Sequence, residues 1–136
     1  MDHPRFSLAF PYQPPVGQPR GRLRPLLPVR LHFRQASTPF LLALVDSGAD
    51  ASAFNIGVAR RLGIDLAACR RLTIRGVGRA VEAYGCLVDV EIEGRRFPAE
   101  VRFVPTATAL LGREDVFMQL KFAFDQRAHT LLVEPY

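Results

Sequence analysis

Short segments in which apolar and polar residues alternate recur through most of the chain, separated by residues typical of turns. In residues 26–34 every second position from Leu27 to Phe33 is apolar. Residues 81–92 and 97–104 alternate in the same way, and Glu93-Gly94-Arg95 between them predicts a hairpin turn. Since side chains of a strand point to opposite faces in turn, this pattern restricts the chain to a mostly β architecture.

The remaining segments fit the same architecture with one or two short helices. The spacing of Phe54, Val58 and Leu62 predicts a short helix within 51–62 that ends at Gly63. Further expected elements are an edge strand at 5–10, a turn at 35–39, a strand at 40–45 buried on both faces, strands at 72–74 and 110–112, a helix at 114–120, and a final hairpin of 121–125 and 130–133. We therefore expect an all-β (mostly), closed or sandwich-like domain.

The length of 136 residues fits a single domain. Six prolines within residues 1–25 predict an extended N-terminal arm, which we place at residues 1–22, with the domain at 23–136. The arm could be an inhibitory pro-segment, a strand that wraps around a dimer, or a disordered tail. The sequence does not decide among these roles.

Composition excludes some function classes. The 18 basic and 13 acidic residues give a net charge of +5, but the arginines are scattered, in pairs at most, which disfavours a nucleic-acid site. No apolar run reaches the roughly 18 residues needed to cross a bilayer, so we expect no membrane contact. The N-terminus lacks the apolar stretch of a signal peptide, so a cytoplasmic location is expected.

Neither the cysteines nor the histidines suggest a metal site. Cys69 and Cys86 lack the spacing of a zinc or redox motif; one disulfide is possible, but two free thiols in a reducing compartment is the simpler interpretation. His3, His32 and His129 are isolated, and we expect them at the surface.

Asp46-Ser47-Gly48-Ala49 directly follows the apolar segment 40–45. A carboxylate at the end of a buried strand is costly unless it is paired or hydrogen-bonded, and a nearby glycine permits close approach of the backbone. Taken alone, the tetrapeptide fits either an ordinary turn or a functional carboxylate.

Two further motifs are weak by themselves. Gly76-Val77-Gly78, flanked by Arg75 and Arg79, fits either a plain hairpin or a mobile hairpin tip, and it lacks the pattern of a phosphate loop. Leu110-Leu111-Gly112-Arg113 is compatible with an ordinary strand end.

The order and spacing of the three motifs together are far more specific. From about Leu27 to Val133 the chain resembles the retropepsin-like aspartic proteases, and it is most similar to their single-domain cellular and bacterial members. The resemblance implies a single-domain acid-protease barrel that acts as an aspartic-type endopeptidase, without a cofactor or a metal.

The resemblance also assigns roles to individual positions. It implies that Asp46 is the catalytic aspartate and that the Ser47 hydroxyl hydrogen-bonds across the two active-site loops. Gly48 would offer its backbone to the substrate, and Ala49 and Asp50 would line the cleft beside it. Gly76, Val77 and Gly78 would form the tip of a flap. Leu110, Leu111 and Gly112 would support the catalytic loop, with Arg113 paired to Asp50. Glu114, where relatives more often carry Asp or Asn, and the arginines beside the flap tip depart from the family pattern.

The chemistry calls for two chains. Hydrolysis of this kind uses two carboxylates that share one proton, and no second Asp-Ser/Thr-Gly occurs in the sequence. We therefore expect a homodimer that pairs Asp46 with its symmetry mate and acts on a polypeptide substrate. The alternatives are a catalytically silent, dimeric peptide-binding module of the same fold and, on the net charge alone, a nucleic-acid-binding protein.

Overall fold

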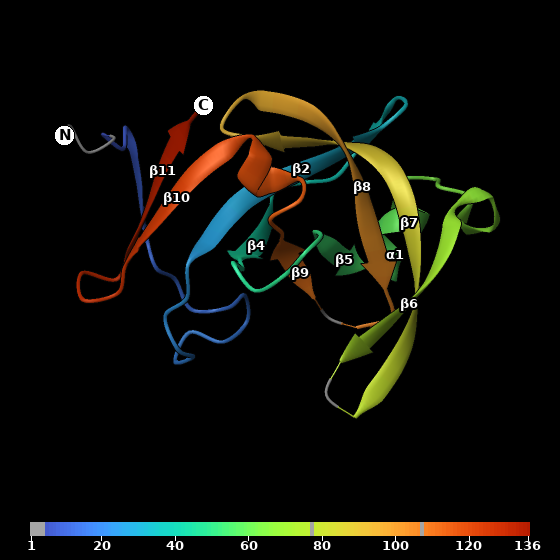
Figure 1. Cartoon of the computed structure of the whole chain (residues 1–136), viewed down its shortest axis with the longest axis horizontal. Coiled ribbons are helices and arrows are strands. Elements are labelled where there is room, and N and C mark those ends of the chain that lie inside the picture. Colours follow the sequence, from blue (N-terminus) through green and yellow to red (C-terminus); the bar gives the residue numbers. More distant parts are fainter. Residues whose placement is uncertain (1–4, 77, 107) are drawn as a thin grey trace.

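The computed structural model describes residues 5–76, 78–106 and 108–136, which form two β-sheets with one α-helix between strands (Figure 1). The strands are β1 (Leu8–Pro11), β2 (Leu26–Phe33), β3 (Ala36–Ser37), β4 (Leu41–Val45), β5 (Ala53–Asn55), β6 (Arg70–Gly76), β7 (Arg79–Ile92), β8 (Arg95–Val104), β9 (Ala109–Leu111), β10 (Leu120–Asp125) and β11 (Thr130–Pro135). The helix is α1 (Ile56–Arg61), and Leu66–Ala68 and Val116–Met118 form 3-10 turns η1 and η2. The predicted mostly β architecture is confirmed.

The larger sheet has eight strands in the order β3-β2-β4-β9-β5-β8-β7-β6, and an additional pairing of β2 with β7 joins its distant strands. Alternation places Leu27, Val29 and Leu31 of β2 in the interior, where each is completely buried. The buried side chains of β7 and β8 join them in one core. The sheet thus curls around its own apolar face, as a barrel does.

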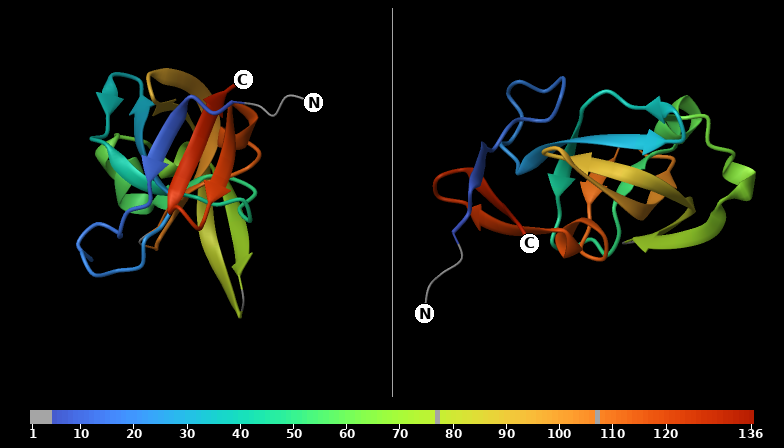
Figure 2. Two further views of the ribbon diagram at one scale, coloured as in Figure 1. Left: turned by 90° about the vertical axis from the view of Figure 1, so that its left-hand side faces the viewer. Right: turned by 90° about the horizontal axis from the view of Figure 1, so that it is seen from above.

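The smaller sheet joins the two ends of the chain in the order β1-β11-β10 (Figure 2). Part of the proline-rich arm is therefore built into the fold: β1 pairs with β11, and the side chain of Tyr12 lies buried in the core.

Three short strands bring distant segments together beside the loop that follows β4. β4 runs parallel to β9, with Leu44 opposite Leu110 and Val45 opposite Leu111. β5 follows that loop, pairs antiparallel with β9, and runs parallel to β8. The loop at residues 46–52 is consequently held from both of its ends by the same sheet.

Two sequence-based expectations about local structure were wrong. The first part of the predicted helix 51–62 is strand β5, because Phe54 is drawn into the core by pairing with β8 and β9, and the helix begins only at Ile56. The predicted strand 40–45 is not buried on both faces: Phe40 precedes β4 and is 67% exposed, with its ring beneath the guanidinium of Arg30.

His32 was also expected at the surface, yet its side chain is buried. Its Nδ1 lies 2.6 Å from Ser37 Oγ and its Nε2 lies 2.7 Å from Glu91 Oε1. The strands on either side of β2 supply these two partners, which makes burial of a polar ring tolerable.

The expectation of free thiols was wrong, because Cys69 and Cys86 form a disulfide with their Cα atoms 5.2 Å apart. The β6–β7 ladder pairs Arg70 with Gly85, so the next position along the ladder places Cys69 opposite Cys86. The disulfide therefore lies at the base of the β6–β7 hairpin.

A search of the described helices finds none with the length and apolar character needed to cross a membrane.

Candidate active site

Asp46 is the first residue after β4, in the loop that leads to β5. Its backbone N–H donates a hydrogen bond to the carbonyl oxygen of Leu111, 3.1 Å away, which continues the parallel pairing of β4 with β9 by one residue. The side chain is half-buried. The fold thus fixes the backbone of Asp46 and leaves its carboxylate accessible.

A tight turn orients the carboxylate of Asp46. The backbone N–H of Gly48 donates to Asp46 Oδ1 at 2.9 Å, and the N–H of Ala49 donates to the carbonyl oxygen of Asp46 at 3.1 Å. A Cβ atom on Gly48 would lie 3.2 Å from Asp46 Oδ1, a tight contact that would push the carboxylate. The glycine therefore allows this carboxylate to sit directly over the turn.

Ser47 occupies the outer side of that turn and is exposed. Within the part of the chain that the structure describes, its hydroxyl group makes no hydrogen bond. The group is free to bond with a neighbouring molecule.

Gly112 and Arg113 support the loop from behind. A Cβ atom on Gly112 would lie 2.7 Å from the Cα of Ala51, so the backbones approach more closely than any side chain would permit. The N–H of Arg113 donates to the carbonyl oxygen of Ala49 at 3.0 Å, and its guanidinium donates to the carboxylate of exposed Asp50. The structure brings these five residues together, and Leu111, next to Gly112 in the chain, is fully buried.

Two residues that hold the loop were not singled out from the sequence. Ser52 is completely buried; its hydroxyl donates to Asp115 Oδ1 at 2.8 Å and accepts from the N–H of Gly112 at 2.9 Å. The other carboxylate oxygen of Asp115 accepts from the N–H of Ser52 at 3.1 Å. This network ties the end of the Asp46 loop to the start of η2. In the sequence, Ser52 and Asp115 appear only as polar residues near the ends of two short apolar strands, β5 and β9.

The predicted hairpin tip lies at the end of the β6–β7 hairpin, which projects from the body of the molecule (Figure 2). Gly76 pairs with Arg79, and Gly78 adopts a positive φ of 76°, which glycine tolerates without strain. Val77 lies outside the described residues. Among the described residues, no hydrogen bond joins the tip to the Asp46 loop.

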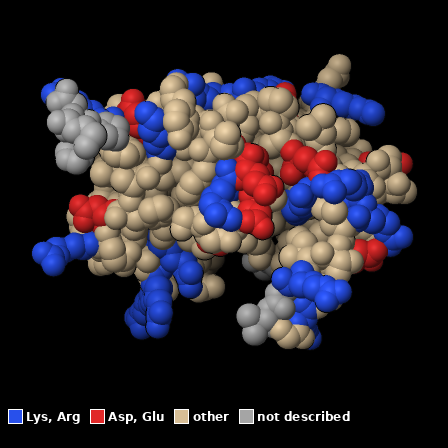
Figure 3. Space-filling view, in the orientation of Figure 1, with Lys and Arg blue, Asp and Glu red and all other residues tan. Residues whose placement is uncertain are grey.

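The basic side chains lie in several separate groups on the face seen in Figure 3, with acidic groups between them. Several form ion pairs, including Arg70 with Glu100 and Arg96 with Asp89. This mixed pattern differs from the continuous basic stripe of a typical nucleic-acid interface.

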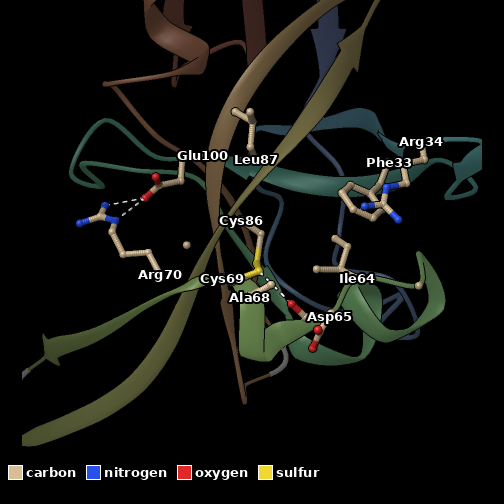
Figure 4. Close-up of a pocket in the computed structure, with 12 residues that line it drawn as sticks. Phe33, Arg34, Ile64, Asp65, Ala68, Cys69, Arg70, Cys86, Leu87 and Glu100 are labelled. Carbon is tan, nitrogen blue, oxygen red and sulfur yellow. Dashed lines mark hydrogen bonds and ion pairs between the residues drawn. A yellow bond between two sulfur atoms is a disulfide. The ribbon is translucent and has the colours of Figure 1, made fainter.

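A cavity of about 410 Å³ lies away from Asp46, beside the disulfide (Figure 4). Its lining includes Phe33, Ile64, both cysteines and Glu100. The hydrogen bond from Arg70 lowers the pKa of the Glu100 carboxyl; burial opposes that shift, and a second hydrogen bond, from Arg102, adds to it. The Arg70–Glu100 pair there anchors β6 to β8, and no residue of the Asp46 loop lines this cavity.

The fold resembles that of a retroviral protease. The solved structure "EIAV protease complexed with the inhibitor HBY-793" matches with a TM-score of 0.56 and 26% sequence identity, over 70% of this chain and 86% of that one. No family model and no curated protein matches the chain. With its sheet curled around one core and its short helix, this chain has an all-β, retropepsin-like fold.

Proposed function

We propose that the chain is a homodimeric aspartic endopeptidase, in which Asp46 of each of two copies forms half of a catalytic dyad. The observation that carries the proposal is the Asp46 loop: an accessible carboxylate held over a glycine turn and fastened to Leu111, Gly112 and Arg113. The similarity to the EIAV protease supports it.

In the proposed reaction, a water molecule lies between the two carboxylates, which share one proton. The ionised carboxylate accepts a proton from the water as the water oxygen attacks the peptide carbonyl carbon, and the protonated carboxyl donates its proton to the carbonyl oxygen. The C–N bond of the resulting tetrahedral diol then breaks: the first carboxyl gives its proton to the leaving nitrogen, and the second carboxylate takes a proton from a diol hydroxyl, which leaves the pair with one proton again. Two carboxylates about 3 Å apart do not readily ionise together, so a pair that shares one proton is the expected active form. The pKa values of such a site belong to the pair.

The rest of the site then has defined tasks. Gly48 and Asp50 would contact the substrate backbone, and Ser47 would bond to the loop of the second copy. The β6–β7 hairpin would close over an extended peptide as a flap. Residues 23–136 would form the protease domain, and residues 1–22 an arm that β1 fastens to it.

The expected cytoplasmic location remains a prediction. The Cys69–Cys86 disulfide counts against a cytoplasmic location, because disulfides persist mainly in oxidising compartments.

The proposal is tested by incubating a mixed peptide library with wild type and with Asp46→Asn at several pH values from about 4 to 7. We expect the wild type alone to cleave, and circular dichroism to show the same fold for both proteins, since Asn is isosteric with Asp. Equal cleavage by the two proteins would refute the mechanism. Cleavage by neither, with peptide binding by both, would favour the silent binding module.

A further inference from the structure

The β6–β7 hairpin has two chemically different faces. Residues opposite each other in an antiparallel pair share a face, and successive residues alternate between faces. The register therefore places the pairs Leu72–Ala83, Ile74–Val81 and Gly76–Arg79 on one face, and Arg71–Tyr84, Thr73–Glu82 and Arg75–Ala80 on the other. Arg79 is the one charged residue in these first three pairs; Arg70, at the base of the hairpin on the same face, is paired with Glu100.

Packing shows which face looks toward the Asp46 loop. Ala83 is completely buried in a small cluster with Ala53 and Val104, and Leu72 packs against that cluster. Ala53 begins β5, directly after the Asp46 loop. The apolar face is thus the inner one, and Arg79 stands at its outermost end, beside the tip.

The charges on the outer face are only partly paired, since Arg75, near the tip, forms no ion pair among the described residues. Arg71 forms an ion pair with Glu82, and its guanidinium also lies 6.0 Å from the centroid of the Tyr84 ring. Arg79 is exposed, and among the described residues no carboxylate lies within ion-pair distance of it. Basic side chains gather over this part of the molecule in Figure 3. Arg75 and Arg79 line a shallow hollow of about 270 Å³ together with Gly78 and Ala80.

We propose that Arg79 makes the site selective for acidic peptides, by pairing with a Glu or Asp side chain a few residues from the bond that is cut. The inference rests on the proposed function. An extended peptide under the hairpin presents alternate side chains to it, and a guanidinium binds a carboxylate through paired hydrogen bonds. In a two-fold dimer each copy supplies one Arg79, so an acidic residue is favoured on both sides of the scissile bond.

The test uses one cleavable peptide with Glu, Gln or Lys placed in turn at each position within four residues of the scissile bond. For wild type we expect kcat/KM about fivefold higher with Glu than with Gln at the best position, the size expected for one partly solvated ion pair, and lower still with Lys. This preference should shrink as NaCl rises toward about 1 M, where charges are screened within about 3 Å.

Arg79→Glu and Arg75→Glu form a matched pair, since they make the same charge change on opposite faces of one hairpin. We expect Arg79→Glu to reverse the order of the peptides. Its kcat/KM should be higher with the Lys peptide than with the Gln peptide, and lower with the Glu peptide than with the Gln peptide. Arg75→Glu should keep the preference for Glu. Equal rates for Glu and Gln peptides in wild type, or an equal effect of the two substitutions, would overturn the inference.

Peptide binding to Asp46→Asn, measured by fluorescence anisotropy, separates this inference from the proposed function. Preferred binding of Glu peptides without cleavage by wild type would sustain the role of Arg79 and refute the protease. Cleavage by wild type, with neither binding nor cleavage favouring Glu, would sustain the protease and refute the role of Arg79.

Discussion

At the scale of single residues, the candidate site depends on contacts between positions far apart in the sequence. Asp46, Gly48 and Gly112 could be picked out from the sequence, because each belongs to a short motif. Ser52 and Asp115 could not, since they are 63 positions apart and a buried hydroxyl that meets a carboxylate leaves no local pattern. His32 was misplaced for the same reason: Glu91, its partner across β2 and β7, is 59 positions away.

The Glu100 carboxylate yields a prediction about pH at this scale. The pKa of this carboxyl is lowered in the folded protein, chiefly by the hydrogen bond from Arg70. The ionised carboxylate therefore stabilises the fold at pH values above the ordinary pKa of 4.5. That stabilisation is lost as the pH falls below 4.5 and through the lower pKa of the folded state. Because the side chain is 41% exposed, solvent screens the effect and we expect it to be small.

The measurement is the urea midpoint of wild type and Glu100→Gln between about pH 3 and 7. The urea midpoint of wild type should be higher than that of the variant at neutral pH, and the difference between the two midpoints should shrink as the pH falls. About 1 M NaCl should also reduce it. A difference that stays constant from neutral to acidic pH would show that Glu100 acts through packing and not through its charge.

At the scale of elements, the alternating strands were the most predictable part. β2, the β7–β8 hairpin and the β10–β11 hairpin lie where alternation places them, because one face of each is buried. β5 was missed since three residues are too few to show a period, and its parallel pairing with β8 is set by tertiary contacts. The disulfide was predictable in principle, because a hairpin that pairs Gly76 with Arg79 aligns position 69 with position 86.

The disulfide yields a prediction about how β6 is held. β6 is an edge strand whose one partner among the described strands is β7, and the bond from Cys69 to Cys86 closes the hairpin at its base. Loop-closure estimates for a loop of this size suggest that Cys69→Ser lowers the free energy of unfolding by about 3 kcal/mol.

The free energy of unfolding should be measured in urea with and without a phosphine reductant. The free energy of unfolding of wild type under reducing conditions should match that of Cys69→Ser. The reductant should leave the free energy of unfolding of the variant unchanged. Amide hydrogen exchange should rise in β6 more than in β8. An unchanged wild type in reductant would mean that the bond does not stabilise the fold.

At the scale of the whole molecule, the proposed reaction requires two chains that act as one enzyme. The sequence has a single Asp-Ser-Gly, the Ser47 hydroxyl has no hydrogen bond within the described part of its own chain, and β10 forms one edge of the terminal sheet. An unpaired strand edge is a common place for a second copy to attach. The family resemblance in the sequence predicted the retropepsin-like fold correctly. Dimerisation and catalysis remain proposals.

The most direct test of this account mixes wild type with Asp46→Asn and measures peptide cleavage. At constant total concentration, with subunits allowed to exchange, an equal mixture should retain about one quarter of the wild-type activity, since only dimers with two aspartates cut. The activity should follow the square of the wild-type fraction across a series of mixtures. A linear dependence, with half the activity left in the equal mixture, would show that each chain acts alone and would contradict the shared dyad.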